Sequence, residues 1–328
     1  MKAQPFRLHD QRVVRAFAEA RRGHRSDEPR LKFGWSNWGF GTEDLAVSAQ
    51  RLERHGVRHI ELHGNLYSPD LGYRPDETVK VLTDHGITVS GVCGMVTPDQ
   101  EFAHNLPHVR ARAIEYFRRQ ASFTQAVGGS YLLFGAASVG RPTAFDSYEL
   151  ERSARTMRLV ADDFAAAGIR GAVEPIRPEE TSVVHTFAQA LRLLQLVDHP
   201  SIAHINGDLY HMLSGELHIG TTILEHGDRM LNLHLADTNR RALGHGLLDL
   251  DVVIMALYAV GYQRGDNYCS AEPLGAGGNP YAAMNLPPEP DRLDELVRVT
   301  AETFRQREDE VLGASDEELY ALYQIDSE

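Results

Sequence analysis

The sequence predicts an α/β protein, a single (β/α)8 barrel of the TIM type. From residue 31 onward, eight short apolar runs alternate with longer stretches of helical periodicity. Glycines such as Gly56, Gly86 and Gly168 stand where the helices should end, since glycine tolerates a left-handed C-cap. The other fold for such an alternation is an open, doubly wound sheet. Its dinucleotide-binding form carries Gly-x-Gly-x-x-Gly after an early strand, and this sequence has none.

Each predicted element has its own signal. The strands are short runs rich in apolar, β-branched and aromatic residues, at residues 32–40, 57–64, 87–95, 130–136, 169–176, 202–209, 231–238 and 266–274. The helices show apolar residues at a spacing of three or four, at residues 43–55, 76–85, 107–127, 147–167, 186–198, 218–226, 249–260 and 292–311. Pro107 suits the first turn of the third helix.

We expect one barrel domain with an extension at each end. Residues 31–312 form the barrel, and the Gly- and Pro-rich segment 275–290 is an insertion loop after the eighth strand. Residues 1–30 hold eight Lys or Arg against four Asp or Glu, with a possible amphipathic helix at 10–22. This favours a packing or docking extension over a nucleic-acid arm. Residues 313–328 form an acidic tail.

Composition and charge exclude several classes of protein. The chain has 328 residues, of which 42% are hydrophobic and 24% charged, as in ordinary globular proteins. A net charge of -13 makes nucleic acid and anionic membranes poor partners. No apolar run reaches the roughly 18 residues of a membrane span, and no secretory signal is evident. With only Cys93 and Cys269, a reducing, cytoplasmic location is expected.

Polar side chains stand at the ends of four successive predicted strands. These side chains are Glu174, Asp208, His234 and Glu272, with His211 shortly after the second of these strands. In a TIM barrel the active site lies at this end, so the side chains should converge. An oxygen-rich set with one imidazole suits Mn²⁺, Mg²⁺ or Co²⁺ better than a thiolate zinc site does. The alternative is that each residue is buried in the core with its own hydrogen-bond partner and no shared cation, but carboxylates are seldom buried without a partner.

These strand ends also carry a family resemblance. The chain resembles the xylose-isomerase-like sugar isomerase/epimerase superfamily, and most of all its ketose 3-epimerases, over roughly residues 32–312. The resemblance rests on Glu-Pro-Ile-Arg-Pro-Glu-Glu at 174–180, Asp-Leu-Tyr-His at 208–211, His-Leu-Ala-Asp-Thr-Asn-Arg at 234–240 and Ala-Glu-Pro at 271–273. One departure is Ala236-Asp237, where the epimerases commonly carry Gly-Glu.

The resemblance implies a role for each matching residue. It implies one divalent metal, Mn²⁺ ahead of Mg²⁺ or Co²⁺, held by Glu174, Asp208, His234 and Glu272. It makes Glu174 and Glu272 the two catalytic carboxylates as well. It places Glu180, His211 and Arg240 on the carbonyl and hydroxyl groups of a sugar. A carboxylate would remove the acidic proton beside the carbonyl, and a second would return a proton on the opposite face.

A closer resemblance is to the large (alpha) subunit of bacterial C-glycoside deglycosidases. It rests on the strings at 63–67, 92–95, 204–208, 254–258 and 272–275. It implies a 3-oxo-glycoside substrate, carbon–carbon cleavage by β-elimination, a small second (beta) subunit and a higher-order oligomer. The departing carbon needs an acid, for which His63 and His211 are candidates, and Trp38 could line the pocket.

Other functions remain open from the sequence. The same deprotonation would serve a ketose 3-epimerase or sugar isomerase. An AP-endonuclease-like barrel is a distant alternative, disfavoured by the negative charge and the single set of metal ligands. A non-catalytic binding subunit is a further one. Glu61, in the second strand, is expected either to orient a metal ligand or to pair with an arginine.

Overall fold

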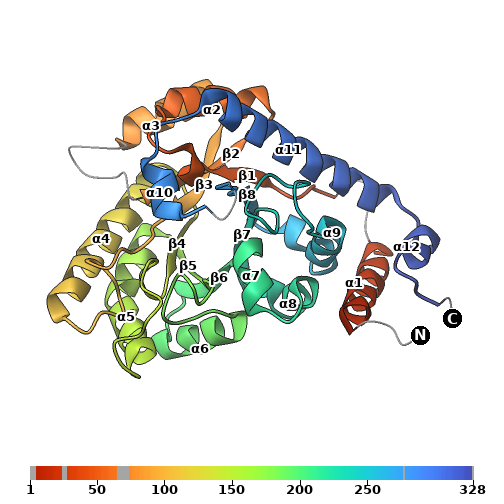
Figure 1. Ribbon diagram of the computed structural model, residues 1–328. Coiled ribbons are helices and arrows are strands. Elements are labelled where there is room, and N and C mark those ends of the chain that lie inside the picture. Colours follow the sequence, from red (N-terminus) through yellow and green to blue (C-terminus); the bar gives the residue numbers. More distant parts are fainter. Residues whose placement is uncertain (1–4, 24–27, 65–73, 276–277, 327–328) are drawn as a thin grey trace.

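Eight parallel strands close into a barrel in chain order, which confirms the predicted TIM fold (Figure 1). The computed structural model describes residues 5–23, 28–64, 74–275 and 278–326. Residues 65–67 of one motif noted above lie outside these ranges. The strands are β1 (Phe33–Ser36), β2 (His59–His63), β3 (Thr88–Cys93), β4 (Tyr131–Gly135), β5 (Arg170–Glu174), β6 (Ile202–Asp208), β7 (Met230–Leu235) and β8 (Tyr268–Ala271).

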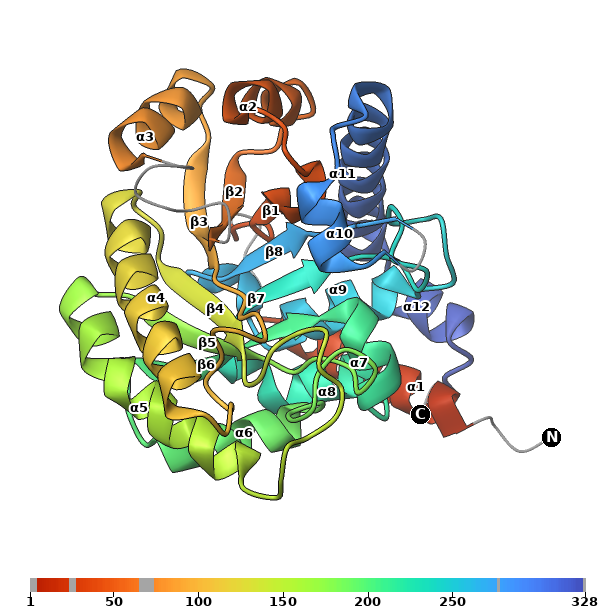
Figure 2. The same ribbon diagram turned by 60° about the vertical axis from the view of Figure 1, so that its left-hand side comes forward.

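Helices surround the barrel, as two views of the chain show (Figures 1 and 2). They are α1 (Pro5–Arg21), α2 (Leu45–Arg54), α3 (Pro75–Asp84), α4 (Pro107–Ala126), α5 (Glu149–Ala167), α6 (Phe187–Val197), α7 (Leu209–Gly215), α8 (Ile219–His226), α9 (Leu250–Ala259), α10 (Pro280–Asn285), α11 (Pro290–Gly313) and α12 (Asp316–Leu322). Helix α5 ends at Gly168, whose φ of +68° is the left-handed conformation that favours glycine.

The core lies between the outer face of the barrel and the surrounding helices. Phe134 on β4 packs against Phe117 of α4 and Phe164 of α5, with ring centroids 5.1 and 5.8 Å apart. All three rings are fully buried. This burial, at about 25 cal/mol per Å² of apolar surface, holds the helices against the strands and makes the barrel a rigid support for the strand ends.

The predicted first strand, residues 32–40, is shorter in the structure. Strand β1 ends at Ser36, which is its last residue paired with β2. A 3-10 turn, η1 (Asn37–Phe40), follows. The chain turns here because the Trp38 indole N–H donates to the carbonyl of Pro280, 2.5 Å away. Gly41 then takes a φ of +63° beside the carbonyl of Leu286, where a Cβ atom would clash. Trp38 therefore lies on a turn and not on a strand.

Three short helices were not predicted, and one of them, α12, lies in the segment 313–328 that was expected to be an acidic tail. Helix α7 directly follows β6, and α10 lies within the segment 275–290 that was expected to be a loop. Asn279 caps α10 by accepting from the amide of Ala282, and Pro280 begins the helix. Helix α10 packs against η1, so α10 covers this end of the barrel. Residues 276–277 of the predicted loop lie outside the described ranges.

Helices from both ends of the chain pack on the barrel and on each other. Helix α1 lies against α8 and α9, and both views show it beside α12 (Figures 1 and 2). Arg7 Nη1 donates to Gln324 Oε1 over 2.7 Å, and His218 Nε2 lies 2.9 Å from Asp10 Oδ1. We propose that both end segments are packing extensions of one domain. Among the described helices, none is long and apolar enough to cross a membrane.

Replacing Phe17 of α1 by alanine should destabilise the protein. Phe17 is fully buried, and its ring lies 6.5 Å from that of Tyr258 on α9. Truncating a buried phenylalanine costs about 3 kcal/mol through lost burial and the cavity left behind. Urea unfolding measures the change, with Phe6→Ala as the matched control because Phe6 of the same helix is 56% exposed. Equal stability of the two variants would show that docking of α1 contributes nothing.

Candidate metal centre

Four side chains meet at the carboxyl ends of β5 to β8. Glu174 ends β5, Asp208 ends β6, His234 lies near the end of β7, and Glu272 follows β8 directly. All four are buried. The distances from His234 Nδ1 are 3.4 Å to Glu272 Oε2, 3.7 Å to Asp208 Oδ2 and 3.9 Å to Glu174 Oε1. One imidazole nitrogen therefore faces three carboxylates.

This donor set fits a divalent cation. Donors about 2.1 Å from one ion lie roughly 3 to 3.5 Å from one another, close to the observed spacings. Ligand atoms of Glu174, Asp208 and His234 lie within 4.8 Å of one another, as do those of Glu61, His234 and Glu272. Glu174 Oε2 is buried with no hydrogen-bond partner among the described residues. Buried oxygens without a partner are costly, and a cation would satisfy them.

The electrostatics of the site point the same way. Burial, reinforced by the charge of Asp208, raises the pKa of Glu174 well above its ordinary value and that of Glu272 to about 7, although His234 opposes both shifts. Burial alone would lower the pKa of His234, but Glu272 and Glu61 outweigh it and raise that pKa. Three crowded carboxylates thus repel one another without a cation, and a divalent ion would offset their charge.

Each proposed carboxylate ligand except Glu174 has one oxygen held by the protein. Asp208 Oδ1 accepts from the amides of Tyr210 (2.7 Å) and His211 (3.1 Å) and thereby caps α7. Its other oxygen, Oδ2, faces His234. Glu272 Oε1 accepts from the Ser36 hydroxyl at 3.0 Å, while Oε2 faces His234. These bonds fix each carboxylate so that its second oxygen points to the centre.

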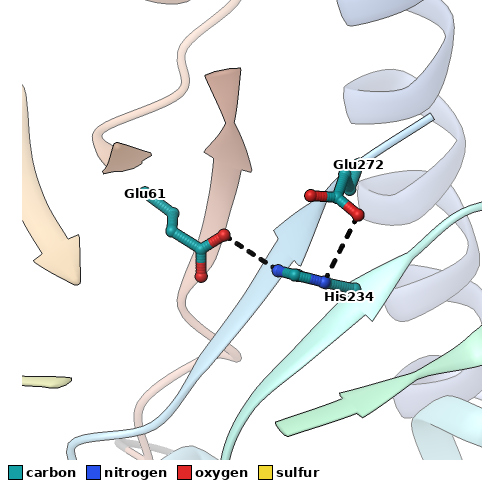
Figure 3. Close-up of side chains that lie close together, drawn as sticks. All are labelled: Glu61, His234 and Glu272. Carbon is teal, nitrogen blue, oxygen red and sulfur yellow. Dashed lines mark hydrogen bonds and ion pairs between the residues drawn. The ribbon is translucent and has the colours of Figure 1, made fainter. Parts of the chain in front are cut away.

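Glu61 orients the imidazole from behind. His234 lies between Glu61 and Glu272 (Figure 3), with Nε2 2.9 Å from Glu61 Oε1. Glu61 Oε2 also accepts from the Tyr131 hydroxyl at 2.7 Å and from Asn232 Nδ2 at 3.2 Å. A proton on Nε2 leaves the lone pair of Nδ1 directed toward the centre, where Asn206 Nδ2 also lies 3.3 Å from Nδ1. The sequence left two roles open for Glu61, orienting a metal ligand or pairing with an arginine, and this contact matches the first.

Replacing Glu61 by glutamine should weaken metal binding. Loss of the carboxylate leaves the tautomer and ring position of His234 less well fixed, and such partners typically contribute 10- to 100-fold in affinity (about 1.4 to 2.7 kcal/mol). Titration calorimetry with Mn²⁺ on metal-free protein measures the change. Glu115→Gln on the exposed surface of α4 is the control. An affinity within twofold of wild type would contradict the orienting role of Glu61.

A cavity adjoins the four side chains. Its lining combines polar or charged residues (Glu174, Glu180, His211, Arg240 and Glu272) with apolar or sulfur-containing ones (Trp38, Cys93, Met95, Val139, Ile176 and Pro280). Three buried polar atoms of this lining have no hydrogen-bond partner within the described ranges: Glu174 Oε2, Glu180 Oε2 and His211 Nδ1. Polar atoms of this kind suit a ligand that carries several hydroxyl groups.

The two candidate acids differ in position. His211 lines the cavity, and His63 is absent from the lining formed by described residues. His63 packs edge-on against Trp38, with ring centroids 5.6 Å apart, and burial lowers its pKa to about 3. Burial also lowers the pKa of His211, so the pKa does not distinguish the two imidazoles. The geometry therefore favours His211 over His63 next to a bound ligand.

Asp237 is a residue whose role the sequence did not reveal. It is buried, and its carboxylate accepts from the amides of Thr238 (2.7 Å), Gly244 (2.9 Å) and Leu248 (3.1 Å). These bonds shape the loop in which Arg240 takes a φ of +61° and reaches the cavity. The signal was the aspartate before a polar turn, which is a typical acceptor for nearby amides.

Comparisons with known proteins place this geometry in a family. The ketose 3-epimerase of Arthrobacter globiformis is 25% identical over 226 residues, covering 68% of this chain and 76% of the relative. The 3-dehydro-D-guloside 4-epimerase of Escherichia coli (strain K12) is 22% identical over 242 residues, covering 71% and 89%. D-allulose 3-epimerase from Methylomonas sp., solved in complex with D-allulose, shares the fold with a TM-score of 0.73 at 22% identity, covering 85% and 98%. The family model for the xylose isomerase-like TIM barrel matches residues 49–302, so the chain belongs to that family.

Proposed function

We propose that the protein is a divalent-metal-dependent sugar epimerase. It would invert a carbon next to the carbonyl of a keto-sugar, either a free ketose or a keto-glycoside. The observation that carries this proposal is the pair of buried carboxylates, Glu174 and Glu272, which reach one centre from the separate strands β5 and β8. Inversion needs removal of a proton from one face and its return on the other, and two carboxylates can divide that work.

The chemistry follows from the residues present. A divalent cation at this centre, when bound, supplies electrostatic stabilisation of the negative charge that develops on a sugar oxygen. One of Glu174 and Glu272 takes the proton from carbon, and the other gives a proton to the opposite face. Glu180, His211 and Arg240 line the cavity and would hold the carbonyl and hydroxyl groups, which keeps the reacting C–H bond aligned.

We propose Mn²⁺ as the metal, with Mg²⁺ and Co²⁺ as alternatives. The ligands Glu174, Asp208 and Glu272 are hard carboxylate oxygens, and His234 adds one imidazole nitrogen. Cys93, the thiol in the cavity lining formed by described residues, belongs to neither cluster of possible ligands found among those residues, and burial raises its pKa well above the ordinary value. This donor set suits Mn²⁺ better than a structural zinc ion.

A C-glycoside lyase is the competing reaction. It would use the same proton removal, followed by loss of a carbon leaving group, and it would bring in the small second subunit and the higher-order oligomer. The relatives reported above are epimerases, which supports epimerisation over β-elimination. The net charge of -13 continues to argue against the endonuclease alternative.

One experiment separates these functions. The Mn²⁺-loaded protein is incubated in D₂O with D-allulose, 3-dehydro-D-guloside or a 3-oxo C-glycoside, and the products are identified by NMR. A new epimer that carries deuterium at the inverted carbon supports the proposal. Release of aglycone without a new epimer would replace it with the lyase, and dependence of that release on a small partner would identify the two-subunit enzyme. No deuterium in any sugar would overturn proton removal itself.

A further inference from the structure

Two arginines contact one tyrosine ring beside the cavity. The guanidinium carbons of Arg177 and Arg240 each lie 4.7 Å from the ring centroid of Tyr210. Arg177 Nη1 also donates to the Tyr210 hydroxyl at 2.7 Å. We call Arg177, Tyr210 and Arg240 the arginine–tyrosine stack. Attraction between cation and ring holds the two like charges at fixed positions.

Both arginines of the stack bind the same carboxylate oxygen. Arg177 Nε lies 2.7 Å and Arg240 Nη1 3.3 Å from Glu180 Oε1. The other oxygen, Oε2, is buried without a hydrogen-bond partner among the residues the structure describes, and Glu180 lines the cavity. The carboxylate is therefore held through one oxygen and presents the other to a ligand.

The two arginines differ in what they contact. The side chain of Arg240 is 3% exposed and lines the cavity, so it can touch a substrate directly. The side chain of Arg177 is 27% exposed and does not occur in the cavity lining formed by described residues. Its polar contacts are with Glu180 and Tyr210. The contacts through which Arg177 can influence a bound sugar are therefore those with Glu180 and Tyr210.

We propose that Arg177 is a positioning residue for Glu180. The planar guanidinium binds Glu180 Oε1 and stacks on Tyr210 at once, which a lysine cannot do. This fixes Glu180 Oε2 as an acceptor for one sugar hydroxyl in the cavity. The inference rests on the proposed function, because it assumes a hydroxyl-bearing substrate in this cavity. It predicts that Arg177 contributes to sugar binding and alignment without touching the sugar.

A double-mutant cycle tests the proposal with D-allulose and Mn²⁺. We expect Arg177→Met to lower kcat/KM by about 10- to 100-fold, the range for a misplaced buried acceptor, and Arg177→Lys to lower it less. In a Glu180→Ala background, Arg177→Met should change kcat/KM less than about twofold, since the group it positions is gone. Affinity for Mn²⁺, measured by calorimetry, should stay unchanged. Arg118→Met, an exposed arginine on α4, is the control.

The contradicting outcomes are distinct. Wild-type kcat/KM in Arg177→Met, with Glu180→Ala impaired, would overturn the role of Arg177 and leave the proposed function standing. A full Arg177→Met effect in the Glu180→Ala background would also overturn it, because Arg177 would then act on the sugar itself. If the wild type converts neither D-allulose nor 3-dehydro-D-guloside, the proposed function fails. Crystal structures then decide: a displaced Glu180 carboxylate in Arg177→Met supports the positioning role, and an unmoved one overturns it.

Discussion

Glu174→Gln and Glu272→Gln should each lower kcat for D-allulose by about 10³-fold or more. An amide has nearly the same shape as the carboxylate but cannot take up a proton from carbon, and proton transfer by a placed side chain contributes about 10² to 10⁴ in rate. Each change also removes one negative charge from a crowded, buried site, so the variants should fold. Rates of epimer formation, followed by chromatography, measure the loss.

Exchange with solvent assigns a face of the sugar to each carboxylate. A variant that keeps one base should still exchange the proton of one epimer in D₂O and not that of the other, and the two variants should show opposite preferences. Glu289→Gln, at an exposed position before α11, is the control. Either variant retaining a tenth of the wild-type kcat would rule out its glutamate as an essential base.

Removal of the metal should abolish activity completely and reversibly. After dialysis against EDTA we expect no detectable epimerisation, and Mn²⁺ should restore it, with Mg²⁺ and Co²⁺ tested alongside. The reason is that no described side chain beside the centre can replace a divalent cation in stabilising the charge of a developing enolate. His234, the basic group nearest the carboxylates, is itself bound by Glu61. Metal content by elemental analysis is measured on the same samples.

Thermal unfolding of the metal-loaded and the metal-free protein tests the predicted metal ligands. The metal-loaded protein should melt at a higher temperature than the metal-free one, since a ligand at 100 times its Kd stabilises the folded state by about 2.7 kcal/mol. Asp208→Asn and His234→Ala should lose most of this gain and should not recover activity with added Mn²⁺. Full activity in protein shown to hold no metal would refute a metal-dependent reaction, and undiminished metal in both variants would refute the ligand set.

The barrel could be predicted because its signals are local. Alternation of apolar runs with helical periodicity depends on residues a few positions apart. Seven of the eight strands lie inside their predicted ranges, and β7 begins one residue before its range. Gly168 ends α5 in a left-handed conformation, as its place in the sequence indicated. Gly227 likewise follows a predicted helix, 218–226, but its φ is -62° and a 3-10 turn continues past it, so a glycine alone does not determine a left-handed cap.

The irregular segments depend on distant contacts and could not be predicted. Residues 37–40 contain two aromatic side chains and look like a continuation of the strand. They form a turn because the Trp38 indole donates a hydrogen bond to the carbonyl of Pro280, about 240 residues away. Helix α10 has six residues and α7 has seven, which is too few to show a period of 3.6. Asn279 is the N-cap of α10 and Asp208 is the N-cap of α7, and the side chain of each accepts a hydrogen bond from a backbone amide.

The candidate site was partly accessible from the sequence. Strand ends of a barrel share one rim, so Glu174, Asp208, His234 and Glu272 could be expected to meet, and the structure brings them together. Their roles as metal ligands and bases stay predictions. The stack of Arg177 on Tyr210 was not foreseen, because residues 33 positions apart meet only through the turn of the chain from β5 to β6.

Asp208 has a consequence for how occupancy of the centre can be observed. One of its oxygens caps α7 through the amides of Tyr210 and His211, and the other faces the centre, so a bound ion would also pin the start of a helix. These two amides should exchange with solvent more slowly in the loaded protein than in the empty one, while amides of the distant α4 should not change. Backbone exchange would then report the state of the ion at single-residue detail, without substrate and without turnover.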